Sequence, residues 1–225
     1  MKLADLPIRR RRKEARPQEL IDAALELFVE KGFASTRAEE VAALAGVSKG
    51  TLYLYFPSKE DLLKAVIEQC LSARITEGVA QAAGFDGPRA ELLRTMLVDW
   101  WTHLYNTPAS GVFKLMITEV RNFPDIAAYY ASAVVEPAHR LLGGVVRSGI
   151  ARGEFRDVNV DAAVHSLILP MIMLCLHKHS LGVCLPENHL TIGPEFIRQH
   201  VDLMLGGLIA APATTPATPN TKRPR

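Results

Sequence analysis

Residues 36–59, TRAEEVAALAGVSKGTLYLYFPSK, decide the fold of this chain. The pattern predicts a helix over 37–44, a sharp turn at Gly46, and a second short helix over 49–55. Gly46 can take the positive φ that such a turn requires. Ala42 is small enough for the two helices to touch, and the apolar positions around it supply a small core. Two short helices joined in this way form a helix-turn-helix, which places its second helix in the major groove of DNA.

The residues around this motif carry a longer pattern, AALELFVEKGFASTRAEEVAALAGVSKGTLYLYFPSKEDLLKAV. Its elements are L-F-x-x-K-G-F at the end of the first helix, A-x-x-A-G-V-S at the turn, and G-T-L-Y-x-Y-F-x-S-K-E-x-L-L after it. Over about 17–66 the chain resembles the DNA-binding domain of the TetR family of transcriptional regulators. The resemblance implies an all-α protein, with an N-terminal three-helix helix-turn-helix domain joined to a larger C-terminal helical domain for dimerisation and ligand binding.

Helical periodicity runs through the rest of the chain, and strict alternation over strand length is hard to find. Pro17 suits a first helical turn, and Thr36 with Glu39 has the spacing of a capping box. A breaker at 84–88 marks a boundary. The predicted helices are 17–31, 37–44, 49–55, 59–83, 88–106, 109–122, 124–152, 159–182 and 194–210. The predicted domains are a disordered basic arm at 1–16, a helix-turn-helix domain at 17–64, a ligand-binding and dimerisation domain at 65–210, and a disordered tail at 211–225.

The candidate DNA contacts surround the second helix of the motif. Its N-terminal residues should meet base edges, with Lys49 donating to guanine and the Thr51 methyl touching thymine. The resemblance assigns a phosphate contact to Lys59. Thr36 is alternatively a cap, and the tyrosines are alternatively core residues. The expected DNA-binding residues are Thr36, Arg37, Ser48, Lys49, Gly50, Thr51, Tyr53, Tyr55 and Lys59.

An arginine run, RRRRK at 9–13, precedes the domain. It can enter a minor groove or lie along phosphates, or it can be a solvated arm. The formal net charge of the whole chain is only +2. Any basic footprint on DNA must therefore come from local clustering of charge.

The larger domain offers many bulky apolar side chains for an effector cavity. The alternative for each is ordinary core packing. Pro170 lies within the predicted helix 159–182 and is expected to kink it. The candidate ligand-binding residues are Met96, Trp100, His103, Phe113, Met116, Glu119, Tyr129 and Met171, with Trp101, Tyr130 and Met173 in the wider set.

One recognition helix spans only a few base pairs, so specificity calls for a second copy. Helices 159–182 and 194–210 are the expected homodimer interface, since both are broadly apolar and the second contains Gly206 and Gly207. The family implies a repressor that binds a palindromic operator in double-stranded DNA and is released by a small, largely apolar effector. An activator, or a DNA-binding protein that responds to a protein partner instead of a small molecule, has the same fold.

Composition favours a cytoplasmic protein with a sizeable core, because 48% of the residues are hydrophobic. The uninterrupted apolar run at 166–176 is too short to span a bilayer. The three cysteines, Cys70, Cys175 and Cys184, lie in or beside apolar runs, which is typical of buried reduced thiols.

A metal-dependent enzyme is the rival from another class. Cys175, His177, His179, Cys184 and His189 cluster in sequence, but residues two apart on a helix face different directions. The chain has no HExxH-type pair and no GxSxG elbow. We therefore expect no metal, no cofactor and no catalytic activity.

Overall fold

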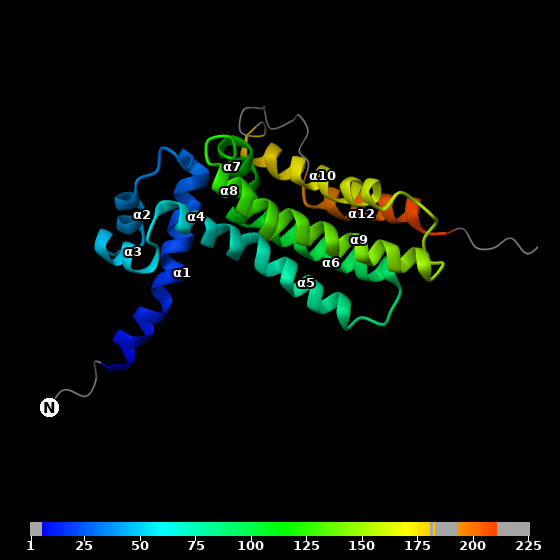
Figure 1. Cartoon of the computed structure of the whole chain (residues 1–225), viewed down its shortest axis with the longest axis horizontal. Helices are drawn as coiled ribbons and strands as arrows, with labels where there is room; N and C mark the ends of the chain where they lie inside the picture. The colour runs from blue at the N-terminus through cyan, green and yellow to red at the C-terminus, as the bar shows by residue number, and fades with distance from the viewer. Residues whose placement is uncertain (1–5, 181, 183–192, 211–225) are drawn as a thin grey trace, which may run out of the picture.

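The computed structural model describes residues 6–180, 182 and 193–210. Within these residues the secondary structure is helical, apart from one antiparallel bridge between Phe155 and Ile209. The expectation of an all-α fold is confirmed. Figure 1 shows the small α1–α4 unit at one end of a longer helical bundle. The elements are α1 Leu6–Lys31, α2 Ala38–Leu44, α3 Lys49–Tyr55, α4 Lys59–Ile67, η1 Glu68–Ser72, α5 Ala73–Ala83, α6 Arg89–Asn106, η2 Pro108–Gly111, α7 Val112–Glu119, α8 Pro124–Tyr130, η3 Ala131–Val135, α9 Glu136–Ala151, α10 Val160–His179 and α12 Glu195–Leu208.

The helix-turn-helix forms as its sequence predicts. Gly46 has a φ of 67°, and the Val47 amide donates to the Ala42 carbonyl over 2.9 Å, which closes the turn between α2 and α3. Val41 and Leu52 are fully buried between these helices and α1. The N-terminus of α3 is thereby held in a fixed orientation on a small apolar core.

Two boundaries near the N-terminus differ from the prediction. The helix α1 begins at Leu6, so residues 6–16 are helical where a disordered arm was expected, and Pro17 lies inside the helix. Arginine, lysine, glutamate and alanine are good helix formers, and here they continue the helix despite a cost of about 3 kcal/mol for an internal proline. Figure 1 shows this part of α1 extending past α2 and α3. The predicted disorder of residues 1–5 and 211–225 lies outside the described residues.

The start of α2 is also one residue later than predicted. Arg37 occupies the N-cap position, and its amide donates to the Glu40 carboxylate over 3.0 Å. The expected capping pair of Thr36 with Glu39 is therefore wrong. The reason is that the Thr36 hydroxyl already donates to the carbonyls of Leu27 and Gly32, over 3.2 Å and 2.8 Å.

The predicted helices 59–83 and 124–152 each contain a π-helical turn, η1 and η3, and the two turns contact each other. A π turn holds one extra residue. Pro137 follows η3 closely, and the wider turn relieves the clash between a proline ring and the carbonyl one turn earlier. The sequence pattern did not reveal either turn.

The C-terminal helices pack as one bundle. Arg94 of α6 forms an ion pair with Asp202 of α12 over 2.8 Å. The bridge between Phe155 and Ile209 ties the end of α12 to the segment after α9. Pro170 lies inside α10. By length and composition, α10 is the one helix of the described chain that is apolar enough to cross a membrane, although 33% of its apolar window is buried. The helix has 20 residues and is therefore longer than the apolar run at 166–176 noted in the sequence.

Candidate nucleic-acid interface and effector cavity

The N-terminal turn of α3 faces solvent. Ser48, Lys49 and Gly50 are exposed, and Tyr53 is 41% exposed one turn later. The Ser48 hydroxyl caps the helix by accepting from the Thr51 amide over 3.1 Å, and the two hydroxyl oxygens lie 2.9 Å apart. This arrangement presents short polar side chains and a glycine where a groove floor has to be approached closely.

Lys49 is not a free charge on this surface. It forms an ion pair with Glu39 of α2 and lies 5.8 Å from the centroid of the Tyr53 ring. The hydrogen bond with Lys49 lowers the pKa of Glu39, and the same contact raises the pKa of Lys49. A base or a phosphate that binds Lys49 has to compete with this carboxylate.

Three expected DNA contacts, Lys59, Thr36 and Tyr55, pack within the domain. The Lys59 ammonium donates to the carbonyls of Phe33, Ala34 and Thr36, over 2.8, 3.3 and 3.1 Å, and lies 4.4 Å from the Phe33 ring centroid. Thr36 is 1% exposed. Tyr55 is partly buried and packs against the core. Lys59 and Thr36 fix the loop between α1 and α2, whereas Arg37 at the N-cap of α2 is exposed.

An apolar cavity of about 570 Å³ lies in the larger domain. It is lined by residues of α6, α7, α8, η3, α9 and α10, and by Leu71 of η1. The residues expected there that do line it are Trp100, Trp101, Phe113, Met116 and Tyr130. Those that the sequence analysis missed include Leu71, Ile117, His139 and His165. The volume suits a small molecule.

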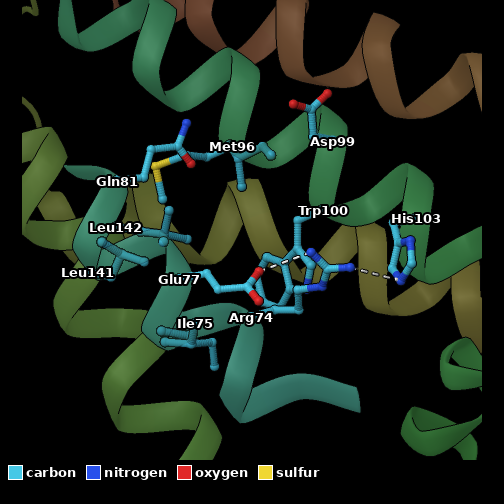
Figure 2. A pocket seen from close by; sticks show the side chains of 13 residues that line it. Arg74, Ile75, Glu77, Gln81, Met96, Asp99, Trp100, His103, Leu141 and Leu142 are labelled. Carbon is cyan, nitrogen blue, oxygen red and sulfur yellow. Dashed lines mark hydrogen bonds and ion pairs between the residues drawn. The ribbon is translucent and has the colours of Figure 1, made fainter. Parts of the chain in front are cut away.

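A smaller recess of about 230 Å³ lies beside the cavity and shares Trp100 and Ala138 with it. Figure 2 shows Arg74 between Glu77 and His103; its guanidinium donates to Glu77 over 3.0 Å and lies 3.3 Å from the His103 ring nitrogen. Met96 and His103, both expected ligand residues, line this recess and not the apolar cavity. Arg74, Glu77 and His103 therefore already interact with one another in this recess.

Three further candidates line neither space. Glu119 is buried against the end of α1, where a Cβ on Gly32 would lie 3.4 Å from its Oε1. Tyr129 turns to the DNA-binding half, and its hydroxyl donates to Glu68 over 3.0 Å. Met171 is fully buried in the core, and Met173 of the wider set is 58% exposed. Helical spacing alone did not separate core from cavity at these positions.

The cavity walls also contact the DNA-binding half. The helix α7 and the turn η2 pack on α1, and α8 packs on α4. At the first junction, a Cβ added to Gly111 would lie 2.4 Å from a methyl group of Val29. A change in the cavity therefore has two direct contacts through which to reach α1 and α4.

The cysteine and histidine cluster seen in the sequence has ordinary packing where the structure describes it. Burial raises the pKa of the Cys175 thiol to about 12. His179 Nε2 lies 2.7 Å from the Ser110 hydroxyl. Among the described residues, no three His, Cys, Asp or Glu side chains converge as metal ligands. Cys184 and His189 lie outside those residues.

An exposed recognition helix and a cavity-bearing helical domain in one chain form the architecture of a transcriptional regulator with its own ligand site. Two family models match: "Bacterial regulatory proteins, tetR family" over residues 20–66, and "Tetracyclin repressor-like, C-terminal domain" over residues 87–181. Together they cover more than half of the chain. The chain belongs to the TetR family of transcriptional regulators.

Individual relatives agree with this assignment. The regulator RutR of Escherichia coli strain K12 is 49% identical over 63 residues, which is 28% of this chain and only 30% of RutR. The transcriptional repressor KstR2 of Rhodococcus jostii is 29% identical over 160 residues, covering 69% of this chain and 76% of KstR2. A solved regulator from Saccharomonospora viridis in complex with choline has a TM-score of 0.70 at 21% identity, covering 88% of this chain and all of that one. The last comparison shows the shared fold.

Proposed function

We propose that this protein is a cytoplasmic, homodimeric repressor that binds a palindromic operator in double-stranded DNA. It releases the operator when a small, largely apolar ligand fills the cavity of about 570 Å³. The observation that carries the proposal is the exposed, Ser48-capped N-terminus of α3, in the same chain as that cavity. KstR2, which covers two thirds of the chain, is itself described as a repressor.

An exposed apolar face supports dimerisation through α10 and α12. Leu169 and Met173 of α10 are 55% and 58% exposed, and Leu203 of α12 is 73% exposed. A Cβ on Gly206 or Gly207 would meet no atom within 4 Å, so another backbone can approach there. A second copy that covers this face by two-fold symmetry also supplies the second recognition helix that a palindrome requires.

Ligand-driven release of the operator is supported by elements that line the cavity and also contact the DNA-binding half. Leu71 lines the cavity within η1, which continues directly from α4. A ligand that binds better when α4 is displaced changes the separation of the two recognition helices. The operator affinity then falls by the ratio of the ligand affinities for the two states.

The decisive experiment is selection of bound duplexes from a random library with the purified protein. A palindrome whose half-sites are spaced for a two-fold dimer supports the proposal. The selected duplex then serves in a release assay against a panel of neutral and charged apolar compounds. Recovery of only salt-sensitive, sequence-independent binding would contradict the proposed operator recognition.

A further inference from the structure

The polar groups that line the cavity of about 570 Å³ limit the charge of a ligand that can bind there. Among the described residues that line it, none is Lys, Arg, Asp or Glu. Its two histidines lie together, with ring centroids 5.6 Å apart, and His139 Nε2 already faces the Asp161 carboxylate over 3.4 Å. An anionic ligand group would find no Lys or Arg in the described wall, and the Asp161 carboxylate already faces His139. Because an unpaired charge is costly to bury, the wall favours an uncharged ligand.

Tyr130 is one polar group of the wall without a hydrogen-bond partner among the described residues. Its hydroxyl makes no hydrogen bond to any residue that the structure describes, and the ring packs against the core. Burial raises its pKa to about 12, so the phenol stays protonated and remains a donor at neutral pH. A partly buried hydroxyl in apolar surroundings gains from an acceptor supplied by a bound molecule.

The neighbouring indoles also carry hydrogen-bond donors without a described partner. Trp100 and Trp101 both line the cavity, and their Nε1 atoms are buried without a partner in the described part of the chain. An indole N–H only donates. Protein atoms cover both nitrogens, so a ligand reaches them only by moving a tryptophan, whereas the Tyr130 hydroxyl needs no such movement.

We propose that the effector is a neutral, largely apolar molecule carrying an oxygen acceptor, such as a ketone or an ester, that accepts a hydrogen bond from the Tyr130 phenol. This inference rests on the proposed function and names the class of ligand for its site. At about 30 Å³ for each water-sized atom, the cavity of about 570 Å³ holds on the order of 15 to 20 non-hydrogen atoms.

Three probes of similar size test the chemistry: hexanophenone, hexylbenzene and phenylhexanoic acid, which are a ketone, a hydrocarbon and an acid. Binding is followed by intrinsic fluorescence, because Trp100 and Trp101 are the two tryptophans of the chain and both line the cavity. No DNA is present, so failure here is distinct from failure of operator recognition.

The wild-type protein is expected to bind the ketone more tightly than the acid at neutral pH. The variant Tyr130→Phe is expected to bind the ketone about three- to tenfold more weakly, the range for one lost hydrogen bond, and to bind hexylbenzene as before. Unchanged hexylbenzene affinity also shows that the variant keeps its fold. Tyr129→Phe is the matched control, because the Tyr129 hydroxyl donates to Glu68 and does not line the cavity.

Three outcomes would overturn the proposal. They are equal ketone affinity in the wild type and Tyr130→Phe, tighter binding of the acid than of the ketone, and no binding of any probe.

Discussion

Replacing Lys59 by methionine separates a structural role from a DNA contact. Methionine keeps most of the apolar stem but removes the ammonium that donates to the carbonyls of Phe33, Ala34 and Thr36. At about 1 kcal/mol for each bond, the free energy of unfolding should fall by about 3 kcal/mol. For a protein of this size the same change lowers the melting temperature by roughly 6–12 °C.

Urea denaturation and calorimetry measure this loss, at equal protein concentration because association alters apparent stability. Lys49→Met is the control: Lys49 is exposed on α3, so its loss should weaken DNA binding and leave the denaturation midpoint unchanged. The structural reading of Lys59 is refuted if Lys59→Met keeps the wild-type midpoint while the slope of log affinity against log salt drops by about one, as for a lost phosphate contact.

Other substitutions probe the remaining polar contacts. Thr36→Val should lower the free energy of unfolding by about 1–2 kcal/mol in urea titrations, because two carbonyls lose a buried hydroxyl, while Thr36→Ser should lose less. Glu39→Gln should raise DNA affinity in a salt titration by releasing Lys49, and a lower affinity would contradict the competition inferred above. Burial, followed by nearby lysine charges, lowers the pKa of His179 below 6.5. The unfolded chain therefore takes up a proton first as pH falls, and stability declines below about pH 6.5. His179→Gln should show a smaller decline between pH 7.5 and 5.5 in thermal unfolding, and an equal decline would exclude His179 as its source.

Local signals explain why the helix-turn-helix was predictable. Gly46 takes the positive φ that its turn requires, and Ser48 caps α3 through a bond that spans three residues. Such features depend on neighbours in the sequence. By contrast, the ammonium of Lys59 reaches a carbonyl 26 residues away, and no local pattern reports that contact.

A cavity lined by bulky apolar residues was predictable from the sequence, but the particular residues that line it were not. The sequence supplies many bulky apolar residues between 96 and 173, and the fold divides them by packing. Phe113 lines the cavity whereas Met171, equally apolar, is fully buried in the core. The π turn η1 rotates the helix by an extra residue and brings Leu71 into the wall. Helical periodicity at a constant spacing does not anticipate such a shift.

Tight junctions connect the cavity walls with the DNA-binding half. The contact of Gly111 with Val29 leaves no room for even a methyl group, so a shift of η2 and α7 cannot be absorbed by compression there. The bond from Tyr129 to Glu68 ties α8 to the turn that follows α4. The cavity wall includes residues of both α7 and α8, together with Leu71 of that same turn. One bound molecule therefore touches elements that reach both α1 and α4, and a ligand that favours a different spacing of these elements must change the operator affinity by the same free energy.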